Sequence, residues 1–261
     1  KVVNPMGQDT VFDPCCGIGD FLSLAYVNSY ATGRPLSDEN LYGADLSKEM
    51  ITLASLNMLL NGDGRARLFH VPPPHGSILW KVASGPRLVQ LLPQYHRGGQ
   101  WDNWPDLTEL LKFDVILTNP PFGEDRSFRP QNDFERSLME TYETWQFRTG
   151  ESLDLGVLFL ENAYRSLKEY GRLGIVLSTA IASIGQWLPV RQWLMERMRV
   201  VATFDLPPNV FAETGVNTTL VVAYKPPEKL LKRLQSQNYE VFVKEIRHVG
   251  YQKRTRKRNV I

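Results

Sequence analysis

The sequence has few cysteines and histidines and no long apolar run. Its 261 residues include two cysteines and four histidines. Cys15 and Cys16 are adjacent, which is a poor geometry for a disulfide and fits a reducing, cytoplasmic setting. None of these residues has the spacing of a zinc site, so we expect no metal. No stretch approaches the roughly 20 apolar residues that a membrane-spanning helix needs, so we expect no membrane segment.

The chain also has no large excess of charge of either sign. The chain carries 30 basic and 28 acidic residues, a formal net charge of +2. Five of the basic residues lie within the last ten positions, and without them the rest of the chain is slightly acidic. Residues 1–250 are therefore not a strongly basic nucleic-acid binder as a whole. We interpret 251–261 as a basic, solvated tail, with phosphate contact as the alternative.

Short apolar runs alternate with amphipathic stretches along the chain. This pattern predicts an α/β fold, in which β-α units form a mostly parallel sheet with helices on both faces. We expect strands near 10–12, 40–44, 66–70, 113–118, 173–177, 200–204, 218–224 and 240–246, and helices near 20–30, 48–60, 153–168 and 188–198.

Two segments interrupt the alternation. Residues 71–112 contain three consecutive prolines, and we interpret them as a long insertion with one helix near 81–92. Residues 123–151 are polar, and a long connection of this kind is typical of functional lids, so we expect an active-site loop there.

A glycine pair marks the first strand-to-helix turn. Gly17 and Gly19 follow a buried strand that ends at Asp13, and they let the backbone turn tightly and approach a ligand. The second strand ends at Asp45, and an acid at this position is the usual way to hold two ribose hydroxyls. The alternative is an ordinary turn with a helix-capping aspartate. The sequence therefore predicts a nucleoside-containing ligand.

The residues after the glycine pair argue against a dinucleotide. Leu22 stands where a pyrophosphate-binding loop has glycine or alanine, and Asp20 at the helix start would repel a diphosphate. S-adenosylmethionine has no phosphate and carries a sulfonium and an ammonium group, which acidic residues suit. We therefore expect S-adenosylmethionine as the cofactor.

The tetrapeptide Asn119-Pro120-Pro121-Phe122 follows the apolar strand at 113–118. An amine conjugated to a ring is a poor nucleophile, and two acceptors facing its N–H groups would localise its lone pair. The Asn119 side-chain oxygen and the Pro120 carbonyl can supply those acceptors. Two prolines stiffen the loop, and Phe122 offers a face on which an extruded base can stack. The alternative is an ordinary Asn-Pro turn.

These motifs together resemble the gamma-class amino-methyltransferases, most closely the modification subunits of type I restriction systems. The resemblance covers residues 11–224 and includes the stretches 158–163 and 206–211. It implies a Rossmann-like methyltransferase fold with a seven-stranded sheet in one catalytic domain, 1–250. It further implies methyl transfer from S-adenosylmethionine to the N6 of a flipped-out adenine in DNA. The implied catalytic residues are Asn119, Pro120, Pro121 and Phe122; the implied cofactor-binding residues are Asp13, Pro14, Cys15, Gly17, Gly19, Phe21, Asp45 and Leu46.

The resemblance also implies that this domain works within a larger restriction-modification enzyme. Such an enzyme has a helical N-terminal region, a target-recognition subunit or domain, and in some systems a restriction subunit. Two alternatives stay open: methylation of a glutamine amide or of an RNA base, and an inactive module that binds nucleic acid. The inactive alternative draws on Pro74–Leu79, which stand where the family has an acid that contacts the cofactor adenine.

Overall fold

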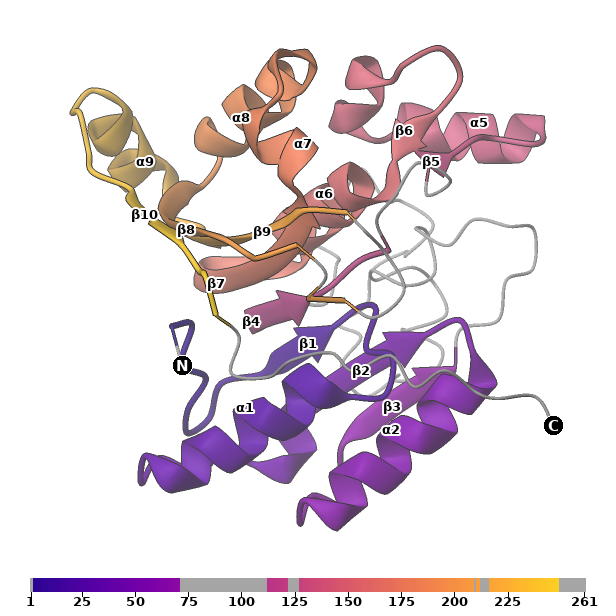
Figure 1. Cartoon of the computed structure of the whole chain (residues 1–261), viewed down its shortest axis with the longest axis vertical. Coiled ribbons are helices and arrows are strands. Elements are labelled where there is room, and N and C mark those ends of the chain that lie inside the picture. The colour runs from indigo at the N-terminus through magenta and orange to yellow at the C-terminus, as the bar shows by residue number, and fades with distance from the viewer. Residues whose placement is uncertain (1, 71–111, 122–126, 209, 212–215, 249–261) are drawn as a thin grey trace, which may run out of the picture.

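The computed structural model describes residues 2–70, 112–121, 127–208, 210–211 and 216–248. Its described residues form one main sheet and one short two-stranded sheet (Figure 1). The strands of the main sheet are β1 (Val11–Asp13), β2 (Leu41–Asp45), β3 (Arg67–His70), β4 (Phe113–Thr118), β7 (Leu167–Ser178), β8 (Arg199–Asp205), β9 (Thr218–Tyr224) and β10 (Phe242–Glu245). The short sheet pairs β5 (Ser127–Phe128) with β6 (Leu153–Asp154).

Helices cover both faces of the main sheet (Figure 1). On one face lie α1 (Asp20–Ala31) and α2 (Lys48–Leu60), and on the other α6 (Leu155–Ser166), α7 (Thr179–Ser183) and α8 (Leu188–Met195). The remaining helical elements are α5 (Asp133–Glu140), α9 (Glu228–Gln235) and the 3₁₀ turns η1 (Asp38–Asn40), η3 (Glu143–Phe147) and η4 (Gly185–Trp187). No helix among the described residues is long and apolar enough to cross a membrane.

The strand order is β10-β8-β9-β7-β4-β1-β2-β3. Only β9 runs antiparallel to its neighbours in this sheet, so the predicted α/β class with a mostly parallel sheet is confirmed. The implied count of seven strands is corrected to eight in the described residues, because β10 extends the edge by pairing with β8. Since β1 pairs in parallel with both β2 and β4, the carboxyl ends of these three strands meet at one edge.

The apolar core has one layer on each side of the sheet. Val11 and Val115 belong to the layer beneath α1, whereas Phe12 and Ile116 belong to the layer beneath α6. The ring centroids of Phe12 and Phe113 are 4.5 Å apart. Because both faces are covered, β1 and β4 read as continuous apolar runs rather than as alternating ones.

Most helices and strands lie where the sequence predicts them, and the segment 123–151 is the main difference. We expected a loop, but its described part contains β5, α5 and η3. Asn132 Oδ1 accepts the Glu135 N–H at 2.9 Å and the Glu135 carboxylate accepts the Gln131 N–H at 2.7 Å, which starts α5. The eight residues of α5 carry an amphipathic pattern, but the helix is short and polar on average, so the sequence did not distinguish it from a loop. The predicted insertion at 71–112, up to residue 111, and the basic tail lie outside the described residues.

Candidate functional site

The glycine turn after β1 adopts left-handed backbone conformations. Gly17 has φ 52° and Gly19 has φ 80°. A Cβ on Gly19 would lie 3.2 Å from the Ala54 Cβ on α2, so this position needs glycine for space as well as for φ. A Cβ on Gly17 would meet no atom within 4 Å. The turn is therefore closed against α2 at Gly19 and open at Gly17.

Asp45 at the end of β2 joins the glycine turn to the start of α2. Its Oδ2 accepts the Gly17 N–H at 3.0 Å and its Oδ1 accepts the Ser47 N–H at 2.9 Å. A carboxylate oxygen can accept two hydrogen bonds, so both oxygens keep capacity for ligand hydroxyls. Leu46 is half-buried, and its carbonyl lies 3.0 Å from His70 Nε2. The structure thus brings Gly17 and Asp45 together, as expected for one binding site.

Asp13 and its neighbours form the buried floor beside this turn. Asp13 and Pro14 are buried, and the Cys15 N–H donates to Asp13 Oδ1 at 3.1 Å. Burial raises the pKa of Asp13 to about 7; the Cys15 N–H and the nearby Thr118 hydroxyl lower it, and the Asp45 carboxylate raises it. The Cys15 thiol has a raised pKa, mainly because it is buried and also because Asp13 and Asp45 are close. Two neighbouring carboxyls therefore favour a cationic ligand here.

Asn119 lies directly after β4, next to the end of β1. The register Phe12↔Ile116 brings the carboxyl end of β4 alongside the Asp13–Pro14 turn. The Asn119 Oδ1 atom is buried and accepts no hydrogen bond from the described part of the chain. Pro120 is buried and Pro121 half-buried, while Phe122 lies outside the described residues. A buried amide oxygen that lacks a donor is costly unless a ligand supplies one, so it fits an acceptor for an incoming N–H.

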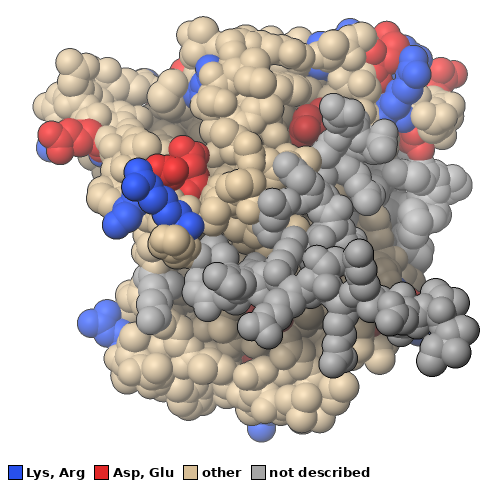
Figure 2. Space-filling model, viewed as in Figure 1, with Lys and Arg blue, Asp and Glu red and all other residues tan. Residues whose placement is uncertain are grey.

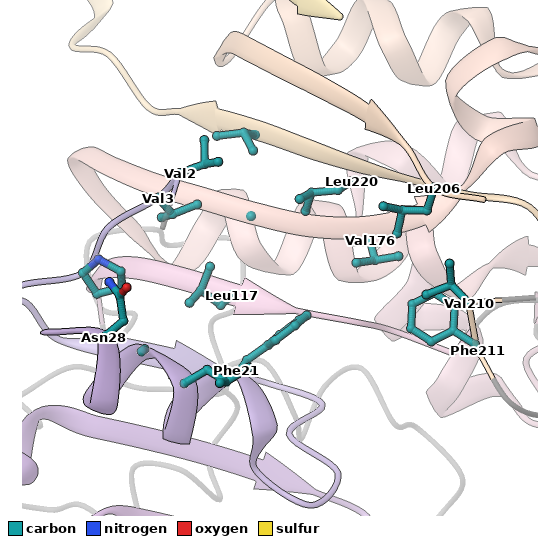
Figure 3. Close-up of a pocket in the computed structure, with 15 residues that line it drawn as sticks. Val2, Val3, Phe21, Asn28, Leu117, Val176, Leu206, Val210, Phe211 and Leu220 are labelled. Carbon is teal, nitrogen blue, oxygen red and sulfur yellow. The ribbon is translucent and has the colours of Figure 1, made fainter. Parts of the chain in front are cut away.

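Phe21 occupies a different place from the other predicted cofactor residues. It lines a pocket of about 440 Å³ between α1 and strands β4, β7 and β9 (Figure 3). Leu117 lies on the floor of this pocket, and Val210 and Phe211 lie at one end. Its other lining residues are Val2, Val3, Pro5, Leu24, Ala25, Asn28, Gly174, Val176, Leu206, Leu220 and Val222. The lining is almost entirely apolar, unlike the acidic surroundings of the glycine turn.

The sequence analysis missed a buried polar cluster on α6. Glu161 is fully buried and forms an ion pair with Arg165, with Arg165 Nη2 2.6 Å from Glu161 Oε1. Thr144 of η3 also donates to this carboxylate, its hydroxyl lying 2.7 Å from Oε2. In the sequence, this Glu and Arg stand four residues apart in a mostly apolar helix, and Glu161 lies within the stretch 158–163 that resembles the family.

On the face of the molecule seen in Figure 2, charges of both signs are mixed. Figure 2 shows that, on the face in view, Lys and Arg side chains lie beside Asp and Glu side chains. Arg136 and Glu151, for example, are paired at 3.2 Å. Within the described ranges, no group of three or more His, Cys, Asp or Glu side chains could hold a metal ion.

Comparison with known sequences gives a match over the whole chain. Residues 1–261 match the family model described as N-6 DNA methylase. The chain is 26% identical over 230 residues to the type I restriction enzyme EcoEI methylase subunit of Escherichia coli, covering 84% of this chain and 38% of that protein. It is 25% identical over 196 residues to the type II methyltransferase M.VspI of a Vibrio strain, covering 75% and 37%. The chain therefore spans less than half the length of these curated relatives.

Solved structures show the same fold. A putative class I S-adenosylmethionine-dependent methyltransferase from Listeria monocytogenes superposes with a TM-score of 0.64 at 14% identity, over 96% of this chain and 62% of that one. A modification subunit of a putative type I restriction enzyme from Vibrio vulnificus superposes with a TM-score of 0.59 at 21% identity, over 86% of this chain and 42% of that one. With the family match over its full length, the chain belongs to the N-6 DNA methylase family.

Proposed function

We propose that this chain is the catalytic core of a DNA adenine-N6 methyltransferase within a restriction-modification system. The observation that carries the proposal is the buried Asn119 Oδ1, an acceptor to which no described residue donates, at the strand end beside the glycine turn. The family match and the names of the relatives support adenine in DNA as the acceptor.

The residues around the glycine turn fit S-adenosylmethionine. Gly17 leaves open space beside a backbone that a ligand can approach, and Asp45 keeps acceptor capacity for two ribose hydroxyls. The Asp13 and Asp45 carboxyls make the site acidic, which suits a sulfonium and an ammonium group. When bound there, the cofactor supplies an electrophilic methyl group. Pro14, Cys15 and Leu46 would shape the walls of this site.

The loop after β4 would prepare the amine. Asn119 Oδ1 and the Pro120 carbonyl would accept the two N–H groups of adenine N6, which localises the nitrogen lone pair. The two prolines reduce the entropy lost when this loop is ordered. Phe122 would stack on the extruded base, a contact worth about 1–3 kcal/mol. The base must leave the duplex because N6 is inaccessible within it.

The proposal includes partners beyond this domain. One of the relatives is named as the methylase subunit of a type I restriction enzyme, and a structural neighbour is named as part of a type I assembly. By analogy, a target-recognition subunit or domain would choose the DNA site, and a restriction subunit would belong to the same system.

Product analysis tests the proposal. The full-length protein with its partner subunits is incubated with labelled S-adenosylmethionine and with unmethylated DNA, RNA or protein. We expect label in N6-methyladenine of DNA, and we expect Asn119→Ala to lower the rate by about 100–1000-fold while cofactor binding persists. Asn61→Ala, which changes an exposed asparagine at the end of α2, serves as the matched control. Label in RNA or glutamine, or no transfer by the complete enzyme, would overturn the proposal.

A further inference from the structure

The segment between β5 and β6, which we call the 127–154 lobe, is a folded unit. Ser127 pairs with Asp154 and Phe128 with Leu153, so the two ends of the lobe are joined. Between them lie α5 and η3, and the Asp154 carboxylate then caps α6 by accepting the Gly156 N–H at 2.7 Å. The lobe stands on the side toward which the arrowheads of β1 and β4 point (Figure 1). It begins shortly after Asn119–Pro121, so it borders the loop that holds the acceptor.

A single buried carboxylate fixes the middle of this lobe to α6. Glu161 Oε1 accepts the Glu143 N–H at 3.0 Å, and Oε2 accepts the Thr144 N–H at 2.8 Å and its hydroxyl at 2.7 Å. Arg165 donates to Oε1 from Nε at 2.8 Å, and its Nη2 also donates to the Thr141 carbonyl at 2.8 Å. The start of η3 is thus held to α6 by main-chain and side-chain donors converging on one anion.

Neighbouring side chains reinforce the same segment. The Tyr142 hydroxyl donates to Asn162 Oδ1 at 2.8 Å. The Glu143 carboxylate reaches α8, where it accepts the Trp193 Nε1–H at 2.8 Å and lies 2.6 Å from an Arg197 guanidinium nitrogen. Residues 141–144 are therefore attached to α6 and α8, two of the three helices on this face of the sheet.

Stability alone does not explain a buried ion pair in this position. Replacing such a pair with apolar side chains of similar volume is often neutral or stabilising, because burial removes both charges from water. What the carboxylate adds is direction: each of its oxygens must meet donors at defined angles. A network of this kind specifies one position of η3 relative to α6.

We propose that Glu161 is a positioning residue for the target side of the site. By holding residues 141–144 against α6, it sets the place of the 127–154 lobe beside the Asn119 loop, where the extruded base has to enter. This inference rests on the proposed function for the identity of the acceptor. The glycine turn lies between β1 and α1, whereas the hydrogen bonds of Glu161 go to Glu143, Thr144 and Arg165.

The experiment separates the two sides of the site. Glu161→Gln keeps the shape but places an amide nitrogen among donors, and Thr144→Val removes only the hydroxyl bond. We expect Glu161→Gln to lower methylation by about 100-fold, the loss that a misplacement of about 1 Å can cause, and to slow base extrusion detected by 2-aminopurine fluorescence. We expect the Glu161→Gln variant to bind S-adenosylmethionine with a dissociation constant within about twofold of the wild-type value. Thr144→Val shows the same pattern with a smaller loss.

The matched control is Asp9→Asn, which removes the ion-pair partner of Arg172 shortly before the amino end of β1. We expect Asp9→Asn to lower the stability of the fold. The ratio of the dissociation constant for DNA to that for S-adenosylmethionine should not change. Amide hydrogen exchange, measured without DNA, should speed up in 127–154 only in the Glu161 and Thr144 variants. Equal losses of cofactor and DNA affinity, or unchanged exchange in the lobe, would overturn the inference. The exchange result stands even if the methylated acceptor proves to be something other than DNA.

Discussion

The two sides of the proposed site are built in different ways. The proposed cofactor side depends on a turn: two left-handed glycines follow β1, and the Asp45 carboxylate accepts main-chain N–H groups from Gly17 and Ser47. The target side uses buried side chains: Glu161 on α6 holds a segment 17 residues earlier in the chain. Backbone geometry leaves a local mark in the sequence, whereas a buried carboxylate is defined by donors that folding brings to it. The difference predicts which side each substitution will damage.

Removing the Arg165 guanidinium, the counter-ion of Glu161, should have the largest effect on stability. Arg165→Met leaves the Glu161 carboxylate buried without its counter-ion, and we expect the free energy of unfolding to fall by about 3–5 kcal/mol. Urea denaturation measures it. The double substitution Glu161→Leu with Arg165→Met should recover part of this loss, since no isolated charge remains. A double variant no more stable than the single one would contradict the expectation.

Crowding the glycine turn should damage the cofactor side. Gly19→Ala places a methyl group in a left-handed conformation and 3.2 Å from the Ala54 Cβ. We expect a loss of about 2–3 kcal/mol in unfolding free energy together with weaker cofactor binding. Gly33→Ala is the matched control, because Gly33 also has a left-handed φ, 68°, but open space around it. Calorimetric titration should show wild-type cofactor affinity in the control. Equal losses of cofactor affinity in both variants would show that the contact with α2 is not the cause.

Acidity should affect the cofactor side through Asp13. Its pKa is raised from 3.8 to about 7, chiefly by burial. Between pH 3.8 and about pH 7 the folded state therefore binds more protons than the unfolded state. The contribution of Asp13 to stability is present below pH 3.8 and is lost as the pH rises through about 7. A cationic ligand favours the ionised carboxyl, so cofactor affinity should rise with pH by up to about tenfold per unit below pH 7. Asp13→Asn should flatten the slope measured by titration from pH 5 to 8, and an unchanged slope would assign it to another group.

The smallest effect should come from one hydroxyl on each side. Tyr142→Phe removes the 2.8 Å bond to buried Asn162, and we expect a loss of about 1 kcal/mol. Tyr26→Phe removes longer bonds of 3.2 and 3.3 Å to the Tyr30 hydroxyl and the Gly62 carbonyl, where water can substitute. Thermal denaturation of both variants compares them. A larger loss of stability in Tyr26→Phe than in Tyr142→Phe would contradict this order and show that the Tyr26 hydroxyl bonds support the cofactor side.

The cofactor side could be predicted from sequence because its elements are local and apolar. The strand at Val11–Asp13 and the helices from Asp20 and Lys48 lie where the pattern placed them, and Ser47 caps α2 by accepting the Met50 N–H at 3.3 Å. The bond from the Gly17 N–H to Asp45 was not predicted, because it joins residues 28 positions apart. Its existence depends on β1 and β2 becoming neighbours in the sheet.

The target side could not be predicted in the same way. The α5 helix begins with polar capping at Asn132, and its amphipathic pattern spans only eight residues, too few to separate it from a polar loop. Strand β7 is longer than expected because its exposed start, Lys168 to Tyr170, has no apolar run to reveal it. The role of Glu161 follows from its burial, which composition does not disclose. Long-range side-chain contacts are what the sequence pattern leaves out.

The close approach of Gly19 to Ala54 has a consequence for how this protein can change over time. Ala54 is fully buried on α2 and lies on no catalytic segment, yet any larger side chain there would push against the turn. Substitutions on α2 are therefore tied to the shape of the proposed cofactor site, at a position that a survey of ligand-contacting residues would overlook. Efforts to redesign α2, or to graft this domain onto another scaffold, should hold alanine at position 54 fixed.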